Sequence, residues 1–150
     1  MGKFNLHKRS IARIAAVQVL YQCALTKASP AHVLIDFPQN FEQDLLKSIG
    51  SKNYNKDFLN LLVTETTHNL KDIDLMIEKA LPETWVFSRV DLVLLCILRL
   101  GVYELWQIPE TDSAVIINEY LNVTHSFYGD KEPGFVNGIL HTISSHLRGK

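Results

Sequence analysis

Apolar residues recur three and four positions apart in several long segments of the chain, a spacing that is typical of amphipathic α-helices. The first such segment predicts a helix over Lys8–Lys27. We expect the following residues to form its inward arc: Ile11, Ile14, Val17, Tyr21, Ala24 and Leu25. Pro30 ends this helix, and a short second helix is predicted over Ala31–Phe37.

The middle of the chain alternates polar stretches with helical spacing. Residues 48–55, SIGSKNYN, predict a loop because Gly, Ser and Asn cluster there. Residues 56–81 again have apolar positions at helical spacing, and Pro82 stops the run. Its polar centre, Thr64–Asn69, indicates a break or bend.

The most apolar segment, Arg89–Trp106, is hydrophobic nearly all round and predicts the buried central helix. Ser88 stands three positions before Asp91, which predicts a capping box at its start. Further helices are predicted over Ser113–Phe127, which Gly129 ends, and over Pro133–His146. Because strand signals are weak throughout, we expect one domain, residues 1–150, with an all-α fold: a compact bundle of six or seven helices.

Charge is distributed unevenly along the chain. Residues 1–35 contain five Lys and Arg residues and no acid, whereas the other residues carry a net charge of −6. A basic end on an acidic body indicates a local anionic partner. The content of 47% hydrophobic and 21% charged residues is that of an ordinary globular protein.

Catalytic and metal-binding patterns are weak. The six histidines are scattered, and His141 and His146 would lie about 140° apart around a helix. Cys23 and Cys96 each lie in an apolar stretch and are expected to be reduced core thiols. Acids such as Asp91 on bundle helices are more often salt-bridged or solvated than catalytic. We therefore expect no enzyme activity, no metal and no cofactor.

The longest apolar run, Val90–Leu98, contains Asp91 and is about half of the roughly 20 residues that span a bilayer. No apolar stretch with a small-residue cleavage site opens the chain. We therefore expect a cytoplasmic protein with no membrane partner.

The basic end of the chain is the first candidate site. Arg9 and Arg13 are four positions apart and would share a helix face, with Lys8 beside them and Lys3 preceding. Guanidinium groups near a helix N-terminus suit phosphate oxygens. The alternative is that these residues only solvate a helix end.

A second candidate site joins the last two helices. Residues 125–135, HSFYGDKEPGF, place Phe127 and Tyr128 near Lys131, a mixture that could stack unpaired bases. Core packing is the alternative for each ring, and it is the favoured one for Phe135.

Four segments together carry a resemblance to a known family. They are ARIAAVQVLYQ (12–22), RVDLVLLCILRLGVYEL (89–105), AVIINEYLNVTHSF (114–127) and GDKEPGFVNGILHTI (129–143). The chain resembles the NusB family of transcription antitermination proteins over essentially its full length. The resemblance implies an all-α protein that binds boxA, a single-stranded RNA element of ribosomal RNA leaders. It also implies a protein partner, the small-subunit ribosomal protein NusE, and recruitment to the RNA polymerase elongation complex with other Nus factors, without catalysis.

The resemblance also implies site residues. The RNA-contacting arginine-rich segment of the family maps onto Lys8, Arg9, Ser10, Ile11 and Arg13, although relatives often carry arginine where this chain has Ser10 and Ile11. This basic segment has fewer cations than that of relatives, so we expect either a lower affinity for RNA or a contribution of Lys3 and Lys131 to the same contacts. Phe127, Lys131 and Phe135 map onto the second RNA surface of the family, before FVNG.

Further residues are assigned to the protein partner and to the fold. Tyr21 and Asp91 are assigned to the NusE partner, with core packing as the alternative for Tyr21. We hypothesise that Asn137 bonds a neighbouring helix end and that Gly138 allows close helix approach. The alternative function, which Ser10 and Ile11 support, is a protein-interaction bundle that binds the ribosomal protein without RNA selectivity.

Overall fold

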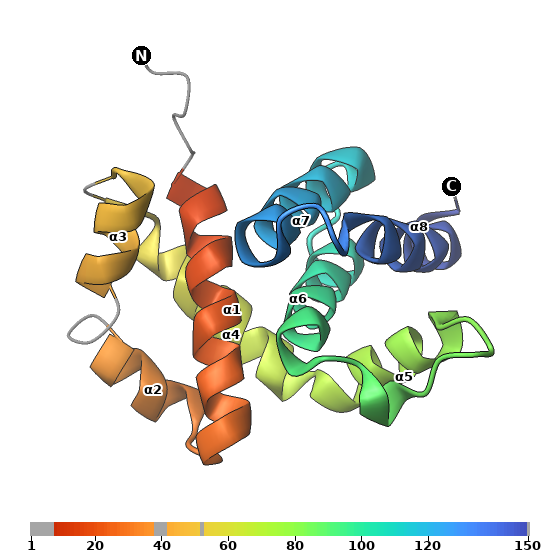
Figure 1. Ribbon diagram of the computed structural model, residues 1–150, viewed down its shortest axis with the longest axis horizontal. Coiled ribbons are helices and arrows are strands. Elements are labelled where there is room, and N and C mark those ends of the chain that lie inside the picture. Colours follow the sequence, from red (N-terminus) through yellow and green to blue (C-terminus); the bar gives the residue numbers. More distant parts are fainter. Residues whose placement is uncertain (1–7, 38–41, 52, 150) are drawn as a thin grey trace. The chain divides into compact units, whose positions relative to one another are not determined.

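The computed structural model describes residues 8–37, 42–51 and 53–149, which form eight α-helices and contain no strand. The predicted all-α fold is confirmed (Figure 1). The helices are α1 (Lys8–Thr26), α2 (Pro30–Phe37), α3 (Gln43–Ile49), α4 (Lys56–His68), α5 (Leu70–Ala80), α6 (Leu92–Gln107), α7 (Ser113–Tyr128) and α8 (Pro133–Arg148).

Two local features raise the number of described helices above the expected six or seven. Helix α3 has too few residues for its apolar period to stand out in the sequence, and its last residues fall in the predicted loop. The run from Lys56 divides at Asn69, within the polar stretch where a break was expected. The Asn69 side chain donates to the Glu65 carbonyl at 2.7 Å, so it competes with the helical hydrogen bonds that would continue α4.

The chain forms two compact units, residues 1–64 and 65–150, which divide within α4. The first unit holds α1, α2, α3 and most of α4, and the second holds α5 to α8.

Helix α1 dominates the first unit. All residues from Ser10 to Val17 are buried, so this part of α1 is covered on every side rather than along one arc. The predicted inward position of Leu25 is wrong, because its side chain is 57% exposed in the last turn. Lys27, with φ of 65°, ends the helix directly afterwards and turns the chain toward α2.

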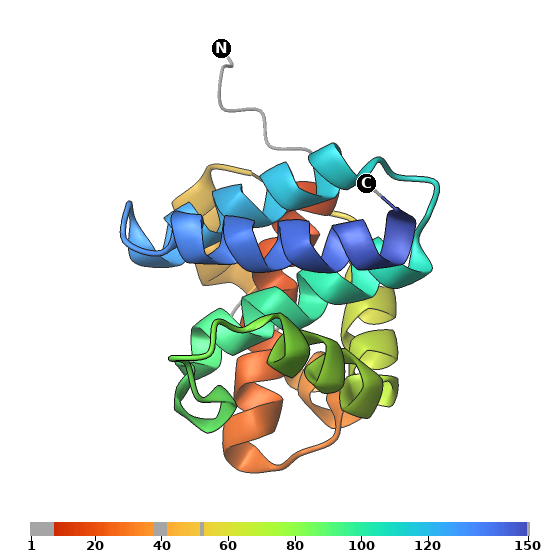
Figure 2. The same cartoon turned by 90° about the vertical axis from the view of Figure 1, so that its right-hand side faces the viewer.

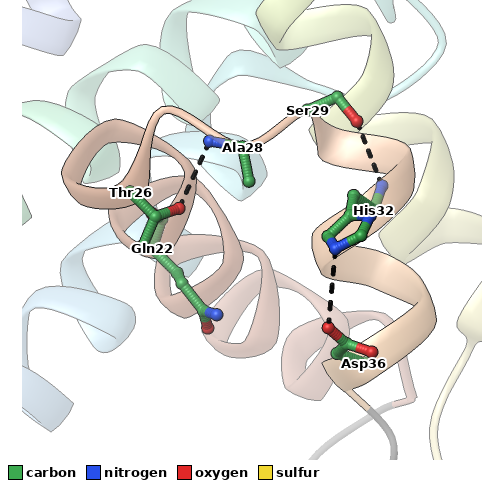
Figure 3. Close-up of polar contacts among 6 residues, drawn as sticks. All are labelled: Gln22, Thr26, Ala28, Ser29, His32 and Asp36. Atoms are coloured by element: carbon green, nitrogen blue, oxygen red, sulfur yellow. Dashed lines mark hydrogen bonds and ion pairs between the residues drawn. The ribbon is translucent and has the colours of Figure 1, made fainter.

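Small polar side chains shape this turn between α1 and α2 (Figure 3). The Thr26 hydroxyl donates to the Gln22 carbonyl and accepts from the Ala28 amide, at 2.8 and 3.3 Å. The Ser29 hydroxyl accepts from the His32 amide at 3.2 Å, so it caps the N-terminus of α2. These bonds satisfy backbone and hydroxyl groups at the two helix ends that face each other across the turn.

Helix α6 is the centre of the second unit, as its composition predicted. It packs against α5, α7 and α8, and eleven of its residues are buried. Figure 2 shows α8 lying alongside α7, and both helices contact α6. Burial on so many sides explains why the apolar positions of α6 run nearly all round it.

The start of α6 differs from the predicted capping box. The cap is Asp91, whose carboxylate accepts from the Leu94 amide at 3.4 Å. Ser88 lies in a short 3-10 helix, Phe87–Arg89, and Val90 is extended. Because the extended residue separates the two helices, the Ser88 hydroxyl is not the cap of α6.

A glycine on α6 lets α8 approach closely. A β-carbon at Gly101 would lie 3.1 Å from both terminal methyl groups of the buried Leu140. The hypothesis that Gly138 allows close approach is wrong, because a β-carbon there would meet nothing within 4 Å. Gly138 lies on the exposed side of α8, whereas Gly101 on α6 is the residue that allows the two helices to come close. The hypothesis for Asn137 stays a prediction.

Matched substitutions test the close approach of α6 and α8. Gly138→Ala should raise the free energy of unfolding by about 0.5–1 kcal/mol, because alanine favours a helix and has free space there. Gly101→Ala gains the same propensity but crowds Leu140, so its unfolding free energy should be about 1–3 kcal/mol lower than that of Gly138→Ala. Urea denaturation of both variants measures this difference, and equal effects would contradict the close approach.

Candidate nucleic-acid interface

The basic end of the chain forms the first turn of α1. Lys8 and Arg9 are exposed at the N-terminus of this helix, whose first turn contains no acidic residue. The unpaired N–H groups at a helix N-terminus carry partial positive charge, which adds to the charges of the Lys8 and Arg9 side chains. This turn is therefore an electropositive corner of the first unit. Lys3, the other predicted cation at this end, lies outside the described residues.

The guanidinium groups of Arg9 and Arg13 both lie over the ring of Phe58. The distances from their Cζ atoms to the ring centroid are 4.3 Å for Arg9 and 5.1 Å for Arg13. This range is that of cation–π interactions. The two arginines therefore share a helix face, as their spacing predicted, and an aromatic residue of α4 holds both.

Asn55 positions Phe58 against the start of α1. Its backbone amide donates to the Lys8 carbonyl at 3.2 Å, and its side-chain oxygen accepts from the Phe58 amide at 2.9 Å. Asn55 thus caps α4 and ties the N-termini of α1 and α4 together. The N-terminus of α4, whose first turn carries Lys56 and Asp57, therefore lies beside the exposed lysine and arginine.

An acidic residue close to this corner already has partners. The Glu42 carboxylate accepts from the Tyr54 hydroxyl at 2.6 Å and lies 3.6 Å from the Lys56 ammonium. Burial, and then the bond to Glu42, raises the pKa of Tyr54 well above its usual range. The hydroxyl therefore stays protonated and keeps donating to Glu42, whose charge Lys56 partly offsets.

Arg13 and Ser10 are not the surface residues that the sequence suggested. Arg13 is only 4% exposed and Ser10 is buried, as is the neighbouring Ile11. The helix is covered on all sides from Ser10 to Val17, so only Lys8 and Arg9 of the described basic segment face solvent. This placement gives Arg13 a packing role beneath the exposed pair.

The second candidate surface lies at the junction of α7 and α8, in the second unit. Phe127 and Phe135 are half-buried, and Lys131 is exposed in the turn between the helices. Gly129 ends α7 with φ of 65°. Phe135 stacks on Trp85 with 4.4 Å between ring centroids and 28° between ring planes. Phe135 is therefore part of an aromatic pair and is not deep in the core.

The two residues assigned to the protein partner differ in surroundings. Tyr21 is half-buried on α1. Asp91 is exposed, yet it caps α6 and also accepts a hydrogen bond from the Tyr128 hydroxyl at the end of α7. Burial, and then the bond to Asp91, raises the pKa of Tyr128 well above its usual range. Asp91 thus joins two helix ends as well as presenting a carboxylate at the surface.

Sequence reasoning missed two aromatic residues, Phe58 and Trp85. Phe58 pairs with arginines far away in the sequence, so no local pattern signals the contact. Trp85, Val86 and Phe87 form a short apolar run outside any helical period, between Pro82 and the start of α6. Such a run between two helices is the signal that could have indicated an exposed aromatic surface.

The described part of the chain shows neither a metal cluster nor a membrane-spanning helix. Within it, no group of three or more His, Cys, Asp or Glu side chains is placed to hold a metal ion. None of the helices described is long and apolar enough to cross a membrane.

Comparison with known proteins gives consistent matches along the chain. The NusB family model matches residues 10–145. The chain is 37% identical over 139 residues to the transcription antitermination protein NusB of Gluconobacter oxydans, covering 91% of this chain and 86% of the relative. It is 34% identical over 149 residues to NusB of Mesorhizobium japonicum, with 97% and 94% covered.

A solved structure also resembles this chain. It is a crystal structure of the antitermination factors NusB and NusE in complex with dsRNA, with a TM-score of 0.73 and 25% sequence identity. The match covers 93% of this chain and 97% of that one. Similarity of fold therefore accompanies the similarity of sequence.

Alanine substitutions distinguish the exposed arginine from the buried one. Arg13→Ala should lower the free energy of unfolding by about 2–4 kcal/mol, because it removes a long packed side chain from the core of the first unit. Arg9→Ala should lower it by less than about 1 kcal/mol, since only an exposed cation–π contact is lost. Thermal and urea unfolding measure both, and a harmless Arg13→Ala would show that Arg13 is not a packing residue.

Proposed function

This chain belongs to the NusB family, and from this premise we propose that it is a transcription antitermination factor. It binds a boxA-type single-stranded RNA in ribosomal RNA transcripts together with the ribosomal protein NusE. The assembly joins the RNA polymerase elongation complex with other Nus factors in the cytoplasm. The chain contributes binding energy and geometry to this assembly and no catalytic step.

The observation that carries the RNA proposal is the exposed Lys8 and Arg9 pair at the start of α1, with Arg9 resting on Phe58. A guanidinium stacked on a ring loses less conformational freedom when it binds phosphate. Its N–H donors remain at the edge of the plane, where a phosphate oxygen can reach them. Arg13 and Ser10 support this turn from beneath, and Lys3 and Lys131 add phosphate contacts.

The aromatic residues at the junction of α7 and α8 bear on whether the bound RNA is single-stranded or double-stranded. The similar crystal structure pairs NusB and NusE with double-stranded RNA, which supports RNA and NusE as ligands of this chain as well. Bases in a duplex are already stacked on one another, whereas unpaired bases can stack on protein rings. The half-buried rings of Phe127 and Phe135 favour a single strand in this chain.

We place the NusE contact at Tyr21 and Asp91, which keep part or much of their surface exposed. Tyrosine suits such a contact because its ring is apolar and its hydroxyl stays able to form hydrogen bonds. The Asp91 carboxylate can accept from a basic ribosomal protein while it continues to cap α6. Asp91→Asn would keep the cap oxygen and remove the charge, so it separates these two roles.

The rival function is a protein-interaction bundle that binds NusE without selecting RNA. The burial of Ser10 and Ile11 favours it, because neither position where relatives often carry arginine offers a cation at the surface here. Such a protein would bind NusE with normal affinity and would bind boxA-like RNA no better than an unrelated strand.

Salt dependence tests the phosphate contacts. Three or four contacts with a single strand predict a slope of log K against log salt of roughly −2 to −3. Arg9→Gln and Lys8→Gln should each make this slope shallower by about 0.7 and weaken binding at low salt. Fluorescence anisotropy with a labelled boxA-like RNA measures both effects.

Lys27→Gln is the matched control, since it removes an exposed cation at the opposite end of α1. It should leave the slope unchanged. A wild-type slope near zero, or equal effects of Lys8→Gln and Lys27→Gln, would contradict the assignment. Binding of NusE without RNA selectivity would favour the rival function, and preference for a duplex over its single strand would contradict the proposed form of the RNA.

A further inference from the structure

Trp85 is a large aromatic side chain that the fold leaves accessible. It is 42% exposed although it stacks on Phe135, and the adjacent Val86 is exposed as well. Phe135 covers one face of the indole, so the ring system is held in place while much of its surface faces solvent. Two adjacent exposed apolar side chains beside an aromatic stack form a surface on which a flat apolar ligand can pack.

Backbone hydrogen bonds within the segment around Trp85 hold its conformation. The Trp85 amide donates to the Pro82 carbonyl at 2.9 Å, and the Arg89 amide donates to the Val86 carbonyl at 2.9 Å. Val90 then donates to the Phe87 carbonyl at 3.2 Å, directly before the Asp91 cap. Two successive turns therefore fix the backbone on both sides of Trp85.

The stack on Phe135 and the hydrogen-bonded backbone together orient the Trp85 indole before any ligand binds. Orientation in advance lowers the entropy cost of binding. Offset stacking between rings gains energy beyond buried area, and it leaves the outer face of the pair available for a third ring.

We infer that the Trp85–Phe135 pair is a stacking platform for one unpaired base of the bound RNA, with Trp85 in contact with the base. This inference rests on the proposed function and adds a base-contacting residue to the aromatic surface around Phe135. A nucleobase is the occupant that fits, because it presents a flat π-face to the indole and needs no charge from the platform. Arg89, exposed one turn further along the chain, is the cation that meets the neighbouring phosphate.

The chemistry of stacking gives this contact a distinct signature. Base–aromatic stacking does not release counterions, so loss of Trp85 should weaken RNA binding by the same factor at every salt concentration. A phosphate-contacting residue instead changes the slope. A purine should bind the platform better than a pyrimidine because its two fused rings cover more of the indole.

The test uses the full-length chain and measures the affinity of labelled boxA-like RNA across a salt series. Trp85→Leu should weaken binding by roughly 5- to 100-fold with an unchanged slope, whereas Trp85→Phe should recover most of the affinity. Leucine keeps an apolar side chain without a π-face, so the two variants separate stacking from general hydrophobicity. Thermal unfolding of both variants controls for the fold.

Fluorescence provides a direct readout of the contact. The chain has two tryptophans, so Trp106→Phe leaves Trp85 as the sole reporter. Saturating RNA should quench its emission, and an RNA with abasic sites should quench it less.

The outcomes separate the inference from the proposed function. If wild-type protein binds RNA and Trp85→Leu binds it equally well, the stacking platform is wrong and the proposed function stands. If Trp85→Leu loses NusE binding but keeps RNA binding, the surface belongs to the protein partner and the inference is also overturned. If the wild-type chain binds no RNA, the proposed function fails, and the inference fails with it.

Discussion

Burial of α6 on nearly every side is the constraint from which the rest of the second unit follows. A helix without a solvent face has to satisfy each of its polar groups with protein atoms, because an unpaired buried group is costly. The fully buried Glu104 carboxylate therefore accepts from the Tyr120 hydroxyl of α7, and Arg99 forms a two-bond pair with Asp74 of α5 at 2.8 and 2.9 Å. At the far end, the Arg148 guanidinium donates to five oxygen atoms in and after α6.

The aromatic surface is a consequence of this same packing. Gly101 lets α8 come close to α6, and Asp91 connects the start of α6 to the end of α7 through Tyr128. These contacts determine where α8 begins, and Phe135 lies in its first turn. The rings that we assign to RNA therefore rest on a helix whose position several buried contacts maintain, which is what an oriented binding surface needs.

The first unit has a different role: it presents the cations Lys8 and Arg9 at the N-terminus of α1 and holds the Arg9 guanidinium over the Phe58 ring. Phe58 provides a single apolar ring that two guanidinium groups share, and Asn55 ties that ring to the start of α1. Arg13 is largely removed from solvent by this arrangement and Arg9 is not. A cluster that looks uniform in the sequence is thus divided into a packed member and an exposed member, with different consequences for stability and for binding.

The sequence by itself determined the helical class, the central place of Arg89–Trp106, the helix ends at Gly129 and Pro133, and the accumulation of positive charge at the start of the chain. Each of these depends on local periodicity, backbone preference or composition, which a single sequence displays directly. Only the tertiary structure decided that Arg13 is buried, that Gly101 and not Gly138 allows close approach, and that Trp85 stacks on Phe135. Those features are contacts between residues distant in the chain, and their energy depends on which faces meet, which no local pattern records.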